Sequence, residues 1–289
     1  MSIVQPKARV ITCIGKNNAI VLYYALQRSA TVTYLEKVSM HEPFEMKREN
    51  AKTIVIFTHG FIGSPEIFRD MAELVYQEGC SALVLLLPGH GATAKYFSRF
   101  RLKDWEKHLE NEIKRVNGEY ENLVLVGHSI GGLLSLNAST NRTCNIIGVF
   151  ALSSPLKLKF SLNAVTIGIK LARHPESKDE VLENYRKLRG VSYKTVFDSL
   201  LWVKQAADVL RLMLKTKANL SEVFVPVTVV NSKNDKTASV KSAKIFASGL
   251  KNTDVKTVIL NKSMHAYYYP DEMETIKKEL IELVKNTAG

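Results

Sequence analysis

The feature that most constrains the fold is a series of six short apolar runs, each rich in valine, isoleucine and leucine. None of them alternates with polar residues, which is typical of strands covered on both faces. Amphipathic helical patterns lie between the runs. Strand alternating with helix predicts an α/β domain with a mostly parallel central sheet and helices on both faces. The strands are expected at 53–59, 82–88, 122–128, 146–154, 226–232 and 255–260, and helices at 64–79, 102–116, 239–250 and 271–286.

Two regions interrupt this alternation. Residues 1–50 precede the first predicted strand and are expected to form an N-terminal extension packed on the core, with no assigned role. Within them, 31–38 has strand character, and a helix near 17–28 is compatible with the sequence. Residues 156–222 indicate two or three helices and no strand, which predicts a small inserted helical cap over the sheet's carboxyl edge. The core domain then comprises residues 51–155 and 223–289.

The charge of the chain limits the classes of partner that we expect. The chain has 40 Lys and Arg against 28 Asp and Glu, a formal charge of +12. No basic run exceeds a few residues and no nucleic-acid motif occurs, so a scattered, solvated charge is favoured and no nucleic-acid partner is expected. The start of the chain lacks the order of a signal peptide, and its apolar stretch at 19–26 is far shorter than the about 20 residues that span a bilayer.

Three widely spaced cysteines without a C-x-x-C pair favour free thiols in a reducing compartment. We therefore expect a cytoplasmic protein without stable membrane insertion. A peripheral contact with anionic lipid stays open, and so does the oligomeric state.

A G-x-S-x-G motif stands between an apolar strand and a helical pattern, at residues 127–131. This context is the one that a nucleophile elbow requires. A serine on such a sharp turn has a strained backbone and needs small neighbours, here Gly127 and Gly131. The turn lifts the Ser129 hydroxyl off the sheet and leaves helix N–H groups facing a reacting carbonyl. Ser129 is the predicted nucleophile, with His128 shaping the elbow; an idle serine in a glycine-rich loop is the alternative.

Backbone donors for an oxyanion are also expected. His59, Gly60 and Phe61 follow the first predicted strand and precede a helix. The predicted donors are the N–H of Phe61 and that of Ile130, the residue after the serine. His59 and Gly60 would shape this turn, and a simple strand-ending turn is the alternative.

Where a nucleophile elbow joins a strand to a helix, the acid and then the histidine follow the serine along the chain. We therefore expect the base and the acid beyond Ser129. Two histidines follow Ser129. His174 falls in the predicted cap, whereas His265 directly follows the last predicted strand and is the expected base. Asp235 follows the strand before it and would fix the imidazole tautomer. Asp198 and Asp208 lie in the predicted cap and Asp254 precedes a strand, so these aspartates are not favoured.

No metal or cofactor is predicted. The histidines and cysteines do not have ligand spacing, and no G-x-G-x-x-G or G-K-[ST] loop occurs. The chemistry of a serine, a histidine and an aspartate needs neither.

Taken together, the motifs resemble those of the α/β-hydrolase superfamily and, more narrowly, of bacterial carboxylesterases and monoacylglycerol lipases. The resemblance covers about residues 52–286 and rests on HGF at 59–61, PGHG at 88–91, DW at 104–105, GHSIGG at 127–132, NSKNDKTAS at 231–239 and SMH at 263–265. Two departures are Met264, where this branch often has glycine, and the long segment before the first matching strand. Extra strands or a dimer contact would explain that segment.

The resemblance implies an α/β-hydrolase fold and a serine hydrolase. Its substrates would be small-molecule esters, with short or medium acyl chains, or monoacylglycerols, bound under the cap and cleaved through a Ser-His-Asp triad and an acyl-enzyme. Thioesterase, acyltransferase and hydroxycinnamoyl esterase activities use the same triad and stay open. A non-catalytic binding protein of this fold is the other alternative. Apolar cap residues at 156–167 and 196–201 would line the pocket or pack on the core, and residues 89–91 would border the site.

Overall fold

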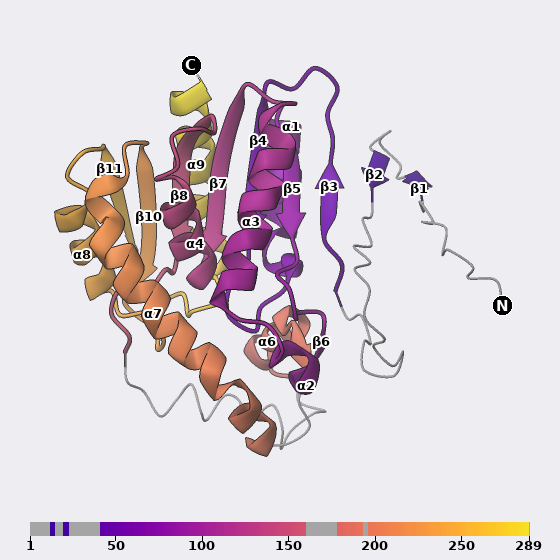
Figure 1. Cartoon of the computed structure of the whole chain (residues 1–289), viewed down its shortest axis with the longest axis vertical. Coiled ribbons are helices and arrows are strands. Elements are labelled where there is room, and N and C mark those ends of the chain that lie inside the picture. Colours follow the sequence, from indigo (N-terminus) through magenta and orange to yellow (C-terminus); the bar gives the residue numbers. More distant parts are fainter. Residues whose placement is uncertain (1–11, 15–19, 23–40, 160–177, 193–195, 289) are drawn as a thin grey trace.

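The computed structural model describes residues 12–14, 20–22, 41–159, 178–192 and 196–288. Within these residues the main sheet has nine strands, in the spatial order β1-β2-β3-β5-β4-β7-β8-β10-β11 (Figure 1). The strands are β1 (Thr12–Ile14), β2 (Ile20–Leu22), β3 (Phe44–Met46), β4 (Thr53–Thr58), β5 (Ser81–Leu85), β7 (Asn122–His128), β8 (Ile146–Leu152), β10 (Val227–Ser232) and β11 (Val255–Leu260).

Six neighbouring strands run parallel to one another: β5, β4, β7, β8, β10 and β11. These are the six strands predicted from the apolar runs, and the prediction of a mostly parallel sheet is confirmed. The other three strands, β1, β2 and β3, extend one edge of the sheet in antiparallel order. The residues before position 51 therefore contribute strands to the main sheet.

One of these edge strands corrects a prediction. The helix considered near 17–28 is wrong at Ile20–Leu22, because these residues form β2. β2 lies between β1 and β3 and pairs with both, and β-branched residues such as Ile20 and Val21 favour such pairing. The strand expected at 31–38 lies outside the described residues.

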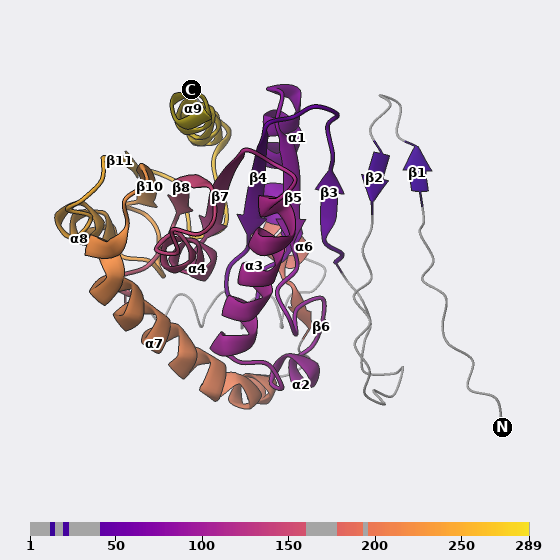
Figure 2. The ribbon, with the colours of Figure 1, turned by 45° about the horizontal axis from the view of Figure 1, so that its top comes forward.

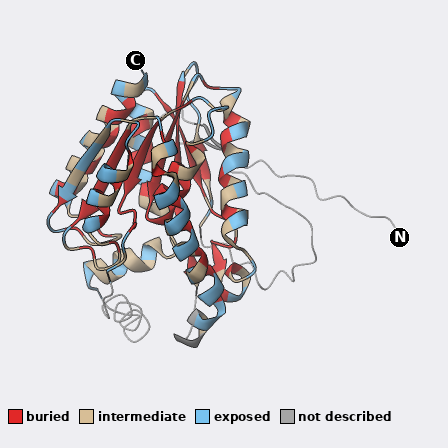
Figure 3. Ribbon diagram, turned by 60° about the vertical axis from the view of Figure 1, so that its left-hand side comes forward, coloured by how far each residue is buried: buried red, intermediate tan, exposed pale blue. Residues whose placement is uncertain are grey.

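Alternate residues of the central strands enter two apolar cores, one on each face of the sheet. In β4, Ile54 and Ile56 join one core, and Val55 and Phe57 join the other. Helices α3, α4 and α8 cover the first face, and α1 and α9 the second. Figure 2 shows α9 across the sheet from α3 and α4, and Figure 3 shows buried strands between helices with exposed outer surfaces. The helices are α1 (Arg69–Gln77, preceded by the 3-10 turn η1, Pro65–Phe68), α3 (Leu102–Asn117), α4 (Ile130–Ala138), α8 (Lys241–Gly249) and α9 (Pro270–Ala288).

β11 differs from the prediction that each strand is covered on both faces. It lies at the edge of the sheet and pairs only with β10 among the described strands. Most of its residues are exposed or half-buried, and Ile259 is 39% exposed. Lys256 on this strand pairs with Glu279 and Glu282 of α9. A charged side chain at this position discourages the edge from pairing with another chain.

The chain between β8 and β10 corrects the prediction of helices without a strand. Val191–Ser192 form a short strand, β9, which pairs in parallel with β6 (Ala92–Thr93) in a separate two-stranded sheet. Because the partners lie far apart in the chain, no local pattern announces this pairing. β6, the short helix α2 (Ala94–Phe97) and α6 lie beyond the carboxyl end of β5 (Figure 1). The other elements described here are α6 (Glu180–Leu188), η2 (Val196–Trp202), α7 (Val203–Asn219) and η3 (Leu220–Glu222).

Candidate active site

Four loops carry the predicted site residues, and each loop follows a parallel strand. His59–Phe61 follow β4, Ser129 follows β7, Asp235 lies shortly after β10 and His265 shortly after β11. Parallel strands end at a common edge, so these loops meet at the carboxyl edge of the sheet.

Ser129 occupies a sharp turn between β7 and α4. Its φ is 54° and its ψ is −119°, a conformation that L-residues rarely adopt. Its N–H donates to the carbonyl of Leu152 at 2.8 Å. A side chain at Gly127 would overlap the backbone of Gly131, and one at Gly131 would overlap the carbonyl of Thr58. The turn therefore depends on both glycines of the motif.

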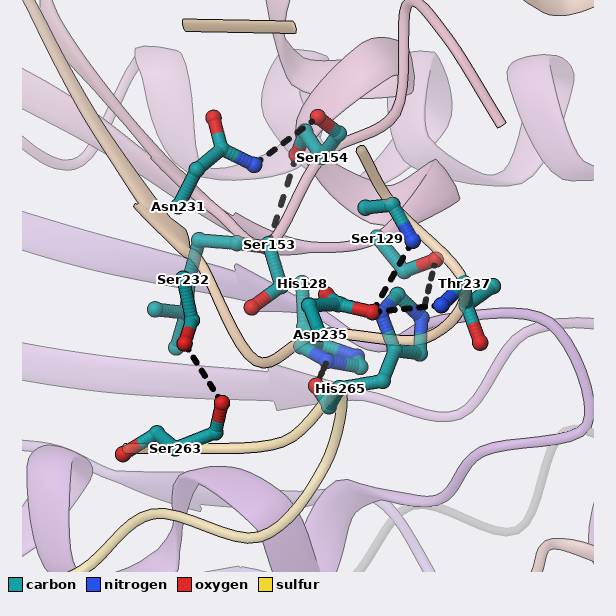
Figure 4. Close-up of polar contacts among 12 residues, drawn as sticks. His128, Ser129, Ser153, Ser154, Asn231, Ser232, Asp235, Thr237, Ser263 and His265 are labelled. Carbon is teal, nitrogen blue, oxygen red and sulfur yellow. Dashed lines mark hydrogen bonds and ion pairs between the residues drawn. The ribbon is translucent and has the colours of Figure 1, made fainter. Parts of the chain in front are cut away.

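Ser129, His265 and Asp235 form a continuous chain of hydrogen bonds (Figure 4). The Nε2 of His265 lies 3.0 Å from the hydroxyl oxygen of Ser129, and its Nδ1 lies 2.8 Å from Oδ2 of Asp235. When Nδ1–H donates to the carboxylate, Nε2 is left as an acceptor for the serine hydroxyl. Ser129 is 5% exposed and the His265 side chain 17%, so the pair is sheltered from bulk water.

The Asp235 carboxylate is held in place from its other oxygen. Oδ1 accepts the N–H groups of Thr237 at 2.7 Å and Ala238 at 2.9 Å, which leaves Oδ2 directed at His265. The carboxylate is fully buried. Burial acts to raise the pKa of Asp235, but the adjacent His265 imidazole and the two amide donors outweigh it, and the pKa is lowered. The group is therefore a charged acceptor at neutral pH.

The two predicted oxyanion donors lie close to the serine. A Cβ built on Gly60 would come within 2.9 Å of the Ser129 Cβ, so the backbone there passes directly beside the hydroxyl-bearing side chain. The Phe61 N–H belongs to the peptide that follows Gly60. Ile130 is the first residue of α4, where a backbone N–H has no acceptor within the helix. That these two groups bind an oxyanion stays a prediction.

His59 fixes the peptide that carries the Phe61 N–H. Its Nε2 accepts the N–H of Leu87 at 3.0 Å, which leaves Nδ1–H to donate to the Gly60 carbonyl at 2.9 Å. Burial lowers the pKa of His59 well below its usual value, so the ring stays neutral and keeps this donor pattern. The carbonyl it holds belongs to the same peptide group as the Phe61 N–H.

His128 contacts the loop of the expected base. Its Nε2–H donates to the backbone carbonyl of His265 at 2.7 Å (Figure 4), and the two rings lie 5.0 Å apart. Burial, assisted by the neighbouring His265, lowers the pKa of His128 to about 3. The ring is therefore neutral at physiological pH, with Nε2–H as its donor.

Several contacts around His265 were missed from the sequence. The Tyr268 hydroxyl donates to the His265 carbonyl at 3.1 Å and lies 2.9 Å from the hydroxyl of Ser153. From α6, the side-chain amide of Asn184 donates to the Ala266 carbonyl at 2.9 Å. Three consecutive tyrosines after His265 were a signal, because a tyrosine hydroxyl beside a histidine loop usually has a partner.

Aromatic rings connect residues 59–63, which we call the oxyanion turn after its predicted donor, to the predicted cap. The ring of Phe61 lies 6.0 Å from that of Trp202, at the end of η2, and 5.5 Å from that of Phe97. His90, from the segment predicted to border the site, lies 4.6 Å from the His59 ring. By contrast, two of the predicted cap residues face outward: Leu200 is 66% and Leu201 47% exposed. His174 and residues 160–167 lie outside the described residues.

No group of three or more histidine, cysteine, aspartate or glutamate side chains that could hold a metal ion occurs in the part of the chain that the structure describes. Over the same residues, none of the helices combines the length and apolarity needed to cross a bilayer.

Comparison with known proteins adds a family. The sequence profile of the family described as "Serine aminopeptidase, S33" matches residues 49–271, which is most of the chain. The match includes the serine, the aspartate and the histidine of the hydrogen-bonded chain.

Individual relatives are distant but span the same region. The chain is 26% identical to the thermostable monoacylglycerol lipase of Bacillus sp. (strain H-257), over 86% of this chain and 96% of the lipase. It is 22% identical to a carboxylesterase of Bacillus subtilis (strain 168), over 86% and 98% of the two chains. The crystal structure of the Paleococcus ferrophilus monoacylglycerol lipase superposes with a TM-score of 0.61 at 17% identity, over 80% of this chain and 94% of that one.

Proposed function

Because the chain belongs to the serine aminopeptidase S33 family of α/β-hydrolases, we propose that it hydrolyses carboxylic esters with Ser129 as the nucleophile. His265 is the proposed base and Asp235 the proposed acid. The substrates are esters of short or medium acyl chains, or monoacylglycerols. No cofactor takes part in this chemistry.

The proposed reaction proceeds through an acyl-enzyme. His265 takes the proton of the Ser129 hydroxyl at Nε2 as the oxygen attacks the ester carbonyl. The N–H groups of Phe61 and Ile130 stabilise the oxyanion of the tetrahedral intermediate. His265 then gives its proton to the departing alcohol. A water molecule, deprotonated by the same imidazole, attacks the acyl-enzyme and releases the acid and the free serine.

The observation that carries the proposal is the unbroken sequence of contacts from the serine hydroxyl through the imidazole to the buried carboxylate. An isolated serine has too high a pKa to attack an ester at neutral pH, and an adjacent oriented base supplies the missing activation. The strained turn at Ser129 adds support, because strain of this kind persists where surrounding structure holds it and is concentrated at functional sites.

The choice of esters over amides rests on the relatives. The family description names a peptidase, whereas the two curated relatives that cover most of this chain are a monoacylglycerol lipase and a carboxylesterase. Both reactions are acyl transfers to a serine, and the same residues would perform either one.

Replacing Ser129 with alanine tests the nucleophile. Hydrolysis of p-nitrophenyl butyrate should fall by about 10⁴- to 10⁶-fold, because loss of the nucleophile leaves only the oxyanion donors and binding. The matched control is Ser135→Ala, on the same helix; Ser135 is fully buried and its hydroxyl has no partner among the described residues. Its activity should stay within about 3-fold of the parent. An active Ser129→Ala protein would refute the assignment.

A substrate panel separates the alternatives. It comprises butyryl and octanoyl p-nitrophenyl esters, a monoacylglycerol, a hydroxycinnamate ester, an acyl-CoA and an amino-acid p-nitroanilide. The proposal expects the highest kcat/KM on the acyl esters or the monoacylglycerol. Preference for the anilide would favour a peptidase and preference for acyl-CoA a thioesterase. Failure of a fluorophosphonate to label the protein at Ser129 would instead favour a non-catalytic binding protein.

A further inference from the structure

A buried acid that the reaction does not use contacts the loop that leads to His265. Glu272 is the third residue of α9 and is 7% exposed. Its carboxylate accepts three consecutive backbone N–H groups: Asn261 at 2.6 Å, Lys262 at 3.0 Å and Ser263 at 2.7 Å. It also accepts the Ser263 hydroxyl at 2.5 Å. One carboxylate thus accepts hydrogen bonds from three consecutive residues at the start of the loop that leads to His265.

The contacts of Glu272 differ from those of an ordinary surface acid. Among the described residues it makes no salt bridge, because the nearby Lys262 ammonium pairs with Asp271 at 2.6 Å. Burial acts to raise the pKa of Glu272, but the Ser263 hydroxyl and the three amides outweigh it, and the pKa is lowered. The charge is therefore balanced by hydrogen bonds from the loop itself, and the loop depends on that charge.

Ser263 also connects Glu272 to the loop that carries Asp235. Its carbonyl accepts the hydroxyl of Ser232, the last residue of β10, at 2.5 Å (Figure 4). The Ser232 oxygen in turn accepts the N–H of Asn234, next to Asp235. Ser263 and Ser232 are both fully buried. Ser263 is thus hydrogen-bonded to Glu272 and, through Ser232, to the loop that carries Asp235.

We propose that Glu272, acting through Ser263, is a positioning residue that sets the separation of the His265 imidazole from the Asp235 carboxylate. This rests on the proposed function of those two residues. Glu272 touches neither the serine nor the imidazole, and it takes no proton in the reaction. Its effect is geometric: a base displaced by a fraction of an ångström loses its alignment with the serine hydroxyl.

The variant Glu272→Gln tests the proposal, because it keeps the size of the side chain and removes the charge. The glutamine amide would direct N–H groups at backbone N–H groups, so the loop cannot keep all four hydrogen bonds. We expect kcat/KM, normalised to the number of sites titrated by a fluorophosphonate, to fall by about 10- to 100-fold, mostly in kcat. The matched control is Glu274→Gln on the same helix, whose side chain is 73% exposed and pairs with Lys277; its activity should not change.

Two measurements separate positioning from a purely structural role. The proton NMR resonance of the His265 Nδ1–H, which reports the hydrogen bond to Asp235, should shift in Glu272→Gln and stay in place in Glu274→Gln. A fluorophosphonate-titrated Glu272→Gln protein with a lower Tm, but with parental kcat and an unmoved resonance, would show that Glu272 only stabilises the fold. This resonance is read without substrate, so it tests the proposal even if the Ser129 experiment were to fail.

A double-mutant cycle tests the route through Ser263. Ser232→Ala removes the hydroxyl that joins the Ser263 carbonyl to the Asp235 loop. If Glu272 acts through this contact, Ser232→Ala and Glu272→Gln together should lower kcat/KM by much less than the product of their separate effects. Independent, multiplicative effects would overturn the route. Should Glu272→Gln fail to fold, Ser232→Ala removes only the hydroxyl that joins the two loops. It should lower kcat in the same way, by a smaller factor, and an unchanged kcat and resonance would reject the proposal.

Discussion

Burial keeps the His128 ring in its neutral form while its Nε2–H donates to the His265 carbonyl. Its ring is 4% exposed, and burial with the neighbouring His265 lowers its pKa to about 3. Two titratable groups affect this pKa besides burial: His265 lowers it further, and the Asp235 carboxylate raises it. The folded protein therefore resists protonation at a site that the unfolded chain protonates near pH 6.5.

This difference predicts a pH-dependent stability. Since the pKa of His128 is lower in the folded state, its neutral form stabilises the fold above pH 6.5, and that stability is lost as pH falls toward about 3. Because of this residue, the free energy of unfolding of the parent, measured in urea, should fall by about 1.4 kcal/mol per pH unit below pH 6. His128→Phe should unfold more easily at pH 7 by about 1 kcal/mol, for the lost hydrogen bond, yet respond less to acid.

Urea unfolding at pH 4.5 to 7.5 checks this, with Tyr268→Phe as the control. That variant removes the second donor to the His265 carbonyl and leaves the buried histidine in place. It should therefore keep the pH slope of the parent. Parallel curves for the parent and His128→Phe would contradict the argument.

At the scale of secondary-structure elements, helix α7 is joined to the core by buried polar contacts. The carboxylate of Asp208 accepts Arg101 at 2.5 and 2.9 Å, the Leu102 N–H at 3.2 Å and Arg211 at 2.6 Å. The Gln205 amide donates to two backbone carbonyls before α3. Hydrogen bonding to Arg101 lowers the pKa of Asp208 to about 2 against the opposing effect of burial, and the Leu102 N–H and Arg211 lower it further.

Asp208→Asn should therefore lower the free energy of unfolding by about 1–2 kcal/mol at pH 7, because water screens the partly exposed Arg101 and Arg211 and reduces the full effect of the pKa shift. The folded-state pKa of this acid lies below its unfolded value, so the contribution is present above pH 4 and disappears as pH falls toward 2. Chemical denaturation at pH 7 and pH 3 checks the sign. The control is Glu106→Gln, which breaks a more exposed pair between α3 and α7 and should cost less than about 1 kcal/mol. Equal losses for both variants would show that the buried pair has no special weight.

A second joint links β9 to the oxyanion turn. The Gly190 N–H donates to the Ile62 carbonyl at 2.8 Å, and the Gly190 carbonyl accepts the Gly91 N–H at 2.6 Å. A side chain on Gly190 would overlap the carbonyl of Gly63. The turn that carries the Phe61 N–H is thus braced by a segment between α6 and η2, far from it in the chain.

Gly190→Ala should push this segment away from the oxyanion turn. We expect kcat/KM to fall by about 10-fold or more, with a destabilisation of about 1–3 kcal/mol. Steady-state kinetics together with urea unfolding check both effects. In the control Gly118→Ala, at the end of α3, the added methyl group meets no atom within 4 Å. A Gly190→Ala protein with parental kinetics would show that the brace does not reach the oxyanion turn.

At the scale of the whole molecule, the sheet was predictable from the sequence and its edges were not. β4, β5, β7, β8 and β10 are buried on both faces, and burial leaves an unbroken apolar run. β2 has three residues and pairs with β1 and β3, whereas β9 has two residues and pairs with β6, far from it in the chain. Each ladder thus comprises only two or three residue pairs. Such pairing leaves no periodic signal, so the sequence suggested a helix for the first and no strand for the second.

The residues of the candidate site also fall into two groups, those that could be predicted from the sequence and those that could not. Ser129, Asp235 and His265 could be found because each follows a recognisable strand and their order along the chain is informative. The hydrogen bonds of Glu272, Ser263 and Asn184 could not, because they depend on how the loops fold against one another. An acid in the first turn of a helix is common, and its spacing does not reveal that it faces three amides.

The closeness of the backbone around Ser129 has a consequence for redesign. The Ser129 turn is packed against main chain at Gly60, Gly127 and Gly131, where even a methyl group would collide with a neighbour. Substitutions intended to alter substrate selectivity are therefore not tolerated at these three glycines. Trp202 and Phe97, whose rings pack against Phe61, are better positions to vary, because exchanging a side chain there leaves the main chain at the three glycines in place.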